Sequence, residues 1–339
     1  FAPGYGALRA LRVRRIDAGQ TVSRTLGALL LCTVAGWAQA QTTPEALDWL
    51  RKIYRATETL SYTGTFVYQQ GDRTETSRIA RLAGPSGGTE KLEVLDGTPR
   101  EVLRSRDEIR CYLPESRIVK VDRRSGPRAF PAVLPEQVGG LTEHYVVSMG
   151  ETRRIAGYDC QAIVLTPKDD LRYGYKLWAD ARSGMLLKAR TIDRDGQTME
   201  QFTFTHLAIG NVPRERLRPP RTDQGWRVEQ AGVSPADLAQ AGWSVGAQLP
   251  GFRKIVEIRR MLRDAQPVAQ MVYSDGLAAV SVFIEPMSGR NEAARIGIAS
   301  MGAVNVYTRE VANHLVTVVG EAPAASVQRI GNTVQYRPQ

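Results

Sequence analysis

A change of hydrophobic period after residue 60 constrains the fold of this chain more than any other feature. Before it, Leu50, Ile53 and Tyr54 recur at helical spacing behind Thr43-Pro44, a pair typical of a helix start. After it, apolar and polar residues alternate in short runs over residues 62–209, separated by turn signals that contain Gly or Pro. The sequence therefore predicts one helix followed by a long antiparallel meander.

A stretch rich in proline and arginine, NVPRERLRPPRTDQG, divides the remaining chain. Its composition is typical of an exposed linker between two domains. The predicted organisation is a signal peptide at 1–40, a first domain at 41–210, the linker at 211–225 and a second domain at 226–339.

The second domain has shorter alternating runs. Two of them turn at Asp275-Gly276 and two at Ala312-Asn313, whereas Ser234-Pro235 predicts a short helix and Pro323 opens a closing helix. We therefore expect a mainly β protein whose second domain is α+β, with a smaller antiparallel sheet and helices on one face.

Residues 1–40 have the pattern of a secretory signal peptide. Several arginines precede an apolar run from Leu26 to Trp37, which is too short to span a bilayer and ends in the cleavage-site pattern Ala38-Gln39-Ala40. Cys32 lies within this run, so a lipid anchor at that cysteine is the alternative. The sequence thus predicts an exported protein.

The chain is basic, with a formal net charge of +10 at pH 7. Five arginines and one aspartate in residues 1–40 contribute four of these charges, so the exported part carries +6. This excess suits an acidic partner or a lipid headgroup, and an ordinary solvated basic surface is the alternative. Export argues against nucleic acid as a partner.

Two cysteines follow the predicted signal peptide, Cys111 and Cys160. In an oxidising compartment, a disulfide between them would close a long loop and stabilise the fold by about 4 kcal/mol. Two separate buried thiols are the alternative, because the sequence does not give the distance between the two Cα atoms.

Motifs that carry catalysis are weak in this sequence. Residues 84–88, GPSGG, match the G-x-S-x-G string of hydrolases, but that motif requires a strand–turn–helix context and here joins two runs of the meander. The histidines are isolated, and no zinc-ligand spacing or phosphate-cradling glycine loop is present. We therefore predict no catalytic residue, no metal site and no cofactor, and a protein that is not an enzyme.

One face of the predicted meander carries many aromatic residues. These side chains either form the core between the sheet and its helix, or line a concave apolar surface of an incompletely closed sheet that binds an acyl chain. The lining candidates are Tyr62, Phe66, Tyr68, Tyr173, Tyr175, Trp178, Phe202 and Phe204.

Several long stretches resemble one known family. They are EALDWLRKIYRATETLSYTGTFVYQQGDRTETSRIARL, GYDCQAIVLTPKDDLRYGYKLWAD, GMLLKARTID, QPVAQMVYSDGLAAVSVFIEP and MGAVNVYTREVANHLVTVVGEAP. Through them the chain resembles the MucB/RseB family of periplasmic sigma-factor regulators over residues 44–335, in the same order and including the linker. The resemblance extends over the whole chain and rests on no catalytic motif.

This resemblance implies both a fold and a function. The first domain is expected to be an unclosed β-barrel similar to the lipoprotein carriers LolA and LolB, with an apolar cavity. The protein is expected in the periplasm as a negative regulator that binds the periplasmic region of a membrane-spanning anti-sigma factor of the MucA/RseA type. It would shield that partner from the protease that begins its degradation, until lipid or lipopolysaccharide fragments release it.

The partner segment is expected against the second domain or across the domain junction, because an extended peptide adds to a sheet edge or fills a groove. A lipid or lipoprotein carrier is the alternative function, and a homo-oligomer is one of the open alternatives for assembly. The partner-binding candidates are the patterned sheet residues Phe283, Val304, Val306, Tyr307, Val316 and Val318.

Overall fold

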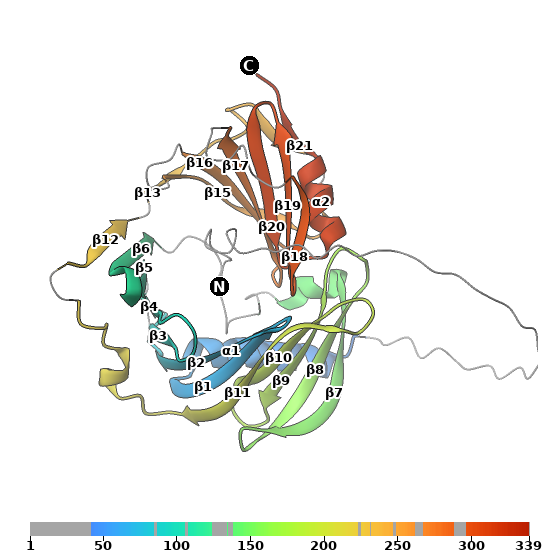
Figure 1. The fold of residues 1–339 in the computed structure, drawn as a ribbon. Coiled ribbons are helices and arrows are strands. Elements are labelled where there is room, and N and C mark those ends of the chain that lie inside the picture. Colours follow the sequence, from blue (N-terminus) through green and yellow to red (C-terminus); the bar gives the residue numbers. More distant parts are fainter. Residues whose placement is uncertain are drawn as a thin grey trace, which may run out of the picture.

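The computed structural model describes residues 42–84, 87–105, 108–123, 134, 138–222, 225–230, 232–246, 249–261, 267–287 and 296–338. The predicted signal peptide and Cys32 lie outside these residues. Figure 1 shows a large curved sheet with a helix against it, and above it a second, smaller sheet with a helix on one side.

The first helix, α1 (Pro44–Thr59), begins and ends as the sequence predicts. The Ala46 N–H donates to the Thr43 side chain at 3.3 Å, and Pro44 occupies the first turn, where a missing N–H costs nothing. Its apolar stripe, including Leu50 and Ile53, is buried against the large sheet. Leu60 is extended and leads the chain directly into the first strand.

The large sheet contains twelve of the described strands and does not close into a complete barrel. Neighbouring strands are antiparallel, except that the strand at one edge, which follows the linker, pairs in parallel with its neighbour. In spatial order they are β12 (Arg227–Gln230), β6 (Ile118–Arg123), β5 (Glu108–Leu113), β4 (Glu101–Arg104), β3 (Thr89–Val94), β2 (Arg73–Leu82), β1 (Tyr62–Gln70), β11 (Thr198–Ile209), β10 (Leu186–Ile192), β9 (Gly174–Asp180), β8 (Tyr158–Pro167) and β7 (Tyr145–Ile155).

The second sheet contains seven described strands, and a two-stranded ribbon lies beside it. The helix α2 (Ala324–Asn332) packs on one of its faces, where Val327 and Ile330 join the apolar side chains of the sheet. The sheet order is β13 (Gly232–Pro235), β15 (Arg253–Met261), β16 (Val268–Ser274), β17 (Ala279–Pro286), β20 (His314–Gly320), β19 (Val304–Val311) and β18 (Gly297–Met301), and the ribbon is β14 (Trp243–Val245) with β21 (Val334–Tyr336).

An unclosed sheet with a helix, followed by a smaller α+β unit, confirms the predicted fold class. The hairpins at Asp275-Gly276 and Ala312-Asn313 also lie between paired strands, β16–β17 and β19–β20. At Ala312 and Asn313 both φ angles are positive, 49° and 60°, as a two-residue hairpin turn of the primed type requires.

The helix predicted at Ser234-Pro235 is wrong, because these residues end the edge strand β13, which pairs with β15. A proline is tolerated in an edge strand, where its missing N–H breaks no inner ladder. The predicted linker is followed by β12, which still belongs to the large sheet because it pairs with β6.

The connection between the domains lies along the large sheet, on the side opposite its helix. Three 3-10 helices occur among the described residues, η2 (Pro114–Ser116), η3 (Val138–Glu143) and η4 (Arg214–Leu217). Of these, only η4 lies in the connection, before β12. The Lys91 ammonium donates to the Arg218 carbonyl at 2.8 Å, and the Trp226 ring lies 6.5 Å from that of Tyr112. These two contacts attach the connection to the large sheet.

Candidate functional site

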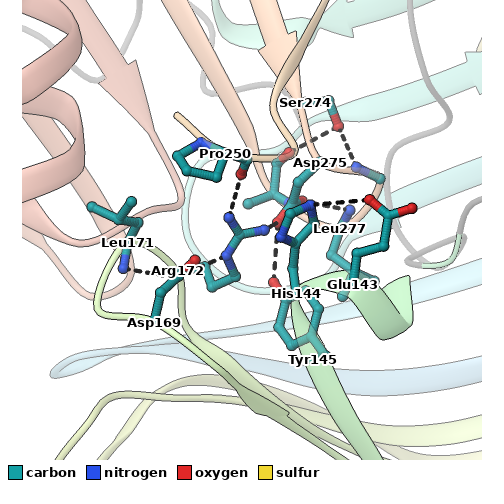
Figure 2. A network of polar contacts seen from close by, with 12 residues as sticks. Glu143, His144, Tyr145, Asp169, Leu171, Arg172, Pro250, Ser274, Asp275 and Leu277 are labelled. Atoms are coloured by element: carbon teal, nitrogen blue, oxygen red, sulfur yellow. Dashed lines mark hydrogen bonds and ion pairs between the residues drawn. The ribbon is translucent and has the colours of Figure 1, made fainter. Parts of the chain in front are cut away.

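The two domains meet at a buried arginine, Arg172, in the connection between β8 and β9 (Figure 2). Its side chain is fully buried, and it donates to Asp169 at 3.0 Å and to the Pro250 carbonyl. It also donates to Asp275, at 2.9 Å, which belongs to the second domain. A guanidinium can be buried at tolerable cost only when its donors are met in this way.

Asp275 is held in place by its own hairpin turn between β16 and β17. Its Oδ1 atom accepts from the backbone N–H groups of Leu277 and Ala278, at 2.9 and 2.8 Å. Its Oδ2 atom is thereby directed toward the first domain, where it accepts from Arg172 and from the Tyr145 hydroxyl at 3.1 Å. Local turn chemistry in one domain thus positions the acceptor for the other.

Aromatic rings enclose the Arg172 guanidinium. It lies 5.7 Å from the centre of the Tyr145 ring and 5.4 Å from that of Phe252, one ring from each domain. Burial, together with the charge of Asp275, raises the pKa of the Tyr145 phenol well above its usual range. The phenol therefore remains a hydrogen-bond donor, and the whole cluster is a satisfied polar core between two domains.

Neighbouring contacts extend this junction. The Asn305 amide donates to the Tyr173 hydroxyl at 3.0 Å, and the Ser326 hydroxyl donates to the Leu171 carbonyl at 2.8 Å. Leu171 also packs against the apolar core of the second domain. A second bridge, from Arg260 to Asp122 at 2.9 Å, lies on β15 and β6 and is more exposed.

Sequence reasoning missed this junction. DDLRYGYK reads only as a loop leading into a strand, and YSDG reads only as a hairpin turn, which it is. Arg172 and Asp275 stand 103 residues apart, and no spacing links them. The one available signal is a single arginine between acidic and aromatic residues, which is common on exposed loops as well.

Four of the predicted lining residues form one aromatic cluster on the face of the large sheet that α1 covers, here called the inner face. The Phe66 ring centre lies 6.4 Å from that of Phe202 and 5.7 Å from that of Phe204, and the Tyr62 ring centre lies 6.2 Å from that of Phe204, all in edge-to-face arrangements. Each of the four is at most 3 % exposed. They are part of the domain core, and their contact with a lipid stays a prediction.

The other lining candidates have different positions. The Tyr68 hydroxyl donates to Glu200 at 2.6 Å, Tyr175 packs against Tyr145 with ring centres 6.3 Å apart, and Tyr173 belongs to the domain junction.

Trp178 is buried, 1 % exposed, and belongs to the same buried cluster. Along β9 it alternates with Tyr175 and Leu177, so its ring lies on the opposite, outer face of the large sheet. There its ring is covered by Lys176, Lys188 and Arg190, at 5.1, 5.5 and 5.5 Å. The prediction that Trp178 shares one face with Tyr173 and Tyr175 is wrong, because Trp178 is an odd number of residues away from them and successive strand residues point to opposite faces.

The predicted partner-binding residues divide between the two faces of the second sheet. Tyr307, Val316 and Val318 belong to the face that α2 covers, and the two valines are 0 % exposed. Phe283, Val304 and Val306 form a small cluster on the other face. The edge strands of this sheet, which the sequence could not identify, are β13 and β18.

The two cysteines are separate free thiols, as in the second alternative, but only one of the two is buried. Cys111 on β5 is partly exposed and Cys160 on β8 is buried. The strands β4, β3, β2, β1, β11, β10 and β9 separate them in the sheet, so a bond between them would require the sheet to close.

The hydrolase-like string has a structural explanation at its last glycine. Gly88 has a φ of 73°, and a Cβ atom there would lie 2.2 Å from the Leu82 carbonyl oxygen. Ser86 itself lies outside the described residues. Among the described residues, no three His, Cys, Asp or Glu side chains gather as metal ligands would. No described helix is long and apolar enough to cross a membrane.

An unclosed, curved sheet joined to an α+β domain through a buried polar junction defines a two-domain protein of mainly β structure. Comparisons with known proteins then give the family. The model of the MucB/RseB N-terminal domain matches residues 45–222, and that of the MucB/RseB C-terminal domain matches residues 237–335. The chain therefore belongs to the MucB/RseB family, which is a family of regulatory binding proteins.

Individual relatives agree with this assignment. The sigma factor AlgU regulatory protein MucB of Pseudomonas aeruginosa is 31% identical over 322 residues, which cover 92% of this chain and 98% of that protein. The sigma-E factor regulatory protein RseB of Escherichia coli is 26% identical over 310 residues, 88% of this chain and 93% of RseB.

Solved structures of relatives agree with the fold. A crystal structure of MucB in complex with MucA(peri) has a TM-score of 0.66 and 28% identity, over 87% of this chain and 100% of that one. A complex of Pseudomonas aeruginosa MucA and MucB has a TM-score of 0.67 and 26% identity, over 87% and 100% of the two chains.

Proposed function

We propose that this protein is a periplasmic negative regulator of an envelope-stress sigma factor. It binds the periplasmic region of a membrane-spanning anti-sigma factor and protects that partner from the protease that begins its degradation. The observation that carries the proposal is the match of both domains to a family whose members are named as sigma-factor regulators, one of them crystallised with the periplasmic part of MucA.

A lipid or lipopolysaccharide fragment releases the partner in this proposal. Release requires the lipid to prefer a state of the protein that binds the partner poorly, since a ligand with equal affinity for both states changes nothing. A tenfold weakening of the affinity for the partner requires the lipid to favour that state by about 1.4 kcal/mol of binding free energy. The junction around Arg172 supports this scheme, because it joins the sheet with the aromatic inner face to the second domain.

Capture of the partner tests the proposal. The protein without residues 1–40 is immobilised and offered the periplasmic fragment of the anti-sigma factor from the same bacterium, with and without lipopolysaccharide. We expect capture without the lipid and release with it. If the fragment is not captured and acylated lipoproteins are instead taken up one to one, the carrier function replaces the regulator.

Protection is measured separately. The fragment is digested with its site-1 protease in the presence of increasing amounts of the protein, and the initial cleavage rate is followed. We expect the rate to fall in proportion to the bound fraction and to recover when lipopolysaccharide is added. Cleavage of the fully bound fragment at the rate of the free fragment would contradict the protective role.

A further inference from the structure

A second contact between the domains lies where the hairpin of β18 and β19 meets the large sheet (Figure 1). Gly302 in this hairpin has no side chain to spare, because a Cβ atom there would clash with the Gln70 side chain and lie 3.1 Å from the Met199 carbonyl oxygen. Gln70 ends β1, and Met199 lies on its neighbour β11. The hairpin therefore rests on the end of the β1–β11 pair.

A polar row crosses the inner face of the large sheet at this end. The register places Gln70 opposite Glu200, Glu200 opposite Thr191 and Thr191 opposite Tyr175. Cross-strand partners point to the same face, and Phe202 of the aromatic cluster lies two residues from Glu200 on that face. The row is therefore the rim of the inner face that is turned toward the second domain.

Both side-chain oxygens of Glu200 are occupied as acceptors. Its Oε2 atom accepts from the Tyr68 hydroxyl at 2.6 Å, and its Oε1 atom accepts from the Thr191 hydroxyl at 3.0 Å. This arrangement suits an ionised carboxylate, because a protonated one would need an acceptor for its own O–H. Glu200 thus places a negative charge on the rim.

A second carboxyl group, that of Glu321, reaches this rim from the second domain. Glu321 directly follows β20, and its backbone N–H donates to the Ala279 carbonyl at 3.3 Å. The next carbonyl along the chain, that of Ala322, accepts from the Asn305 amide at 2.8 Å, and the same amide donates to Tyr173 of the first domain. The segment that carries Glu321 is therefore held at the domain junction.

The surroundings of Glu321 oppose a negative charge. Partial burial raises the pKa of its carboxyl to about 7, and the charge of Glu200 adds to this rise. The charge of Glu321 in turn helps to raise the pKa of the Tyr68 and Tyr175 phenols, so it lies close to both rings of the rim. Within the described part of the chain, Glu321 has no ion pair with a lysine or arginine.

The other charged groups around the rim do not neutralise it. Arg190 lines a small pocket together with Glu200, but it belongs to the outer face, where it covers Trp178. Arg172 is already bonded to two aspartates. Three further carboxylates act on the phenols around the rim, Glu75 on β2, Asp193 before β11 and Asp275 at the junction.

We propose that Glu200 and Glu321 form a proton switch at the domain junction, which docks the two domains more tightly in acid than at neutral or alkaline pH. When both groups are ionised, two like charges face each other from different domains and oppose docking. A proton on Glu321 removes one of these charges and adds a hydrogen-bond donor. The switch is a property of the protein alone and goes beyond its regulatory function.

The direction of the pH dependence follows from proton binding. In separated domains Glu321 is hydrated and titrates near the ordinary glutamate pKa of about 4.3. The docked state keeps the proton up to a pH of about 7, so docking takes up a proton between these two values. The contribution of Glu321 to docking is complete below this window. It is lost as the pH rises, by up to about tenfold in the docking equilibrium for each pH unit.

Thermal unfolding of the protein without residues 1–40 tests the switch at pH 5 and pH 8. Glu321→Gln replaces the carboxyl with a neutral group of the same shape. We expect it to raise the Tm by about 5 °C at pH 8 and by less than about 2 °C at pH 5. Glu310→Gln is the matched control, because Glu310 is exposed on β19 of the same domain, and it should shift the Tm by less than about 1 °C at either pH.

Glu200→Gln completes a double-mutant cycle that assigns the effect to the junction. In the Glu200→Gln background the repelling charge is absent, so the gain from Glu321→Gln at pH 8 should be smaller by about 2 °C. At pH 5 the two substitutions should act additively. Additive effects at both pH values would place the cause within the second domain and overturn the switch.

A direct titration keeps the test decisive if a variant folds poorly. Carbon-13 NMR of the glutamate carboxyl groups in the native protein should show one group with a midpoint near 7. Titration of every glutamate below a pH of about 5.5 would overturn the switch, and so would an equal Tm gain in Glu321→Gln at both pH values. Capture of the anti-sigma fragment at one fixed pH is a separate measurement, so failure of the switch leaves the regulatory proposal untouched.

Discussion

Arg172 and Asp275 form a hydrogen-bonded ion pair of 2.9 Å across the junction of two domains, with no exposed surface on either side chain. The first residue comes from a loop of the large sheet and the second from a hairpin of the small one. Removing one member of such a pair leaves a buried charge without its counterion, which is costly, whereas pairs at the surface contribute little.

We therefore expect Asp275→Asn to destabilise the protein by about 3 kcal/mol, because the amide keeps an acceptor for the hairpin turn and removes the charge that faces Arg172. Urea unfolding, followed by fluorescence, measures this change. Separation of one transition into two would show that the domains unfold independently once the junction is weakened.

Arg260→Ala provides the control for this variant. It also breaks an interdomain ion pair, with Asp122, but at a site where the side chains are 23% and 35% exposed. We expect Arg260→Ala to lower the free energy of unfolding by no more than about 1 kcal/mol. If both variants lower the free energy of unfolding equally, the special role assigned to the buried pair is wrong.

Gly64 allows close packing of the aromatic cluster on β1. A Cβ atom at this position would lie 2.6 Å from Cε1 of Phe204 and 2.8 Å from the His206 carbonyl oxygen. Gly64→Ala should therefore destabilise the first domain by about 1–3 kcal/mol through overpacking.

Gly139→Ala is the matched control for Gly64→Ala, because no heavy atom lies within 4 Å of its added Cβ. It should change the free energy of unfolding by no more than about 0.5 kcal/mol, as surface substitutions usually do. A Tm unchanged in Gly64→Ala would mean that the Phe204 ring can move aside without cost, and the inner face would be less rigid than we infer.

The two thiols should differ in reactivity. Burial raises the pKa of both, and it raises that of Cys160 to about 12, helped by the charges of Asp180 and Asp159. In the native protein, a thiol reagent should label Cys111 first, and Cys160 only after unfolding. Mass spectrometry without reductant gives the order, and the absence of any free thiol would contradict the structure.

The raised pKa of the Cys160 thiol makes the stability of the protein depend on pH. Its pKa is higher in the folded than in the unfolded chain, where it is about 8.5. The folded state therefore binds the proton more tightly, and the contribution of this group is complete below about pH 8.5. The free energy of unfolding should decline as the pH rises from there toward 12, and Cys160→Ser should remove this part of the decline.

Most helices, strands and turns of this protein follow from short-range sequence patterns. The helix at Pro44, the alternating runs and the turns at Asp275 and Ala312 are local features, because capping, period and backbone conformation are set by residues close together in the chain. The error at Ser234 is local as well, since an edge strand tolerates the same Ser-Pro pair that begins helices.

Contacts between distant side chains, in contrast, depend on how the strands and domains are arranged in space. Which face of the sheet Trp178 occupies depends on a shift of one residue, and whether Cys111 meets Cys160 depends on whether a sheet closes. The pairing of Arg172 with Asp275 arises from the docking of the two domains. These contacts join residues far apart in the chain, so their energies depend on packing that no local pattern encodes.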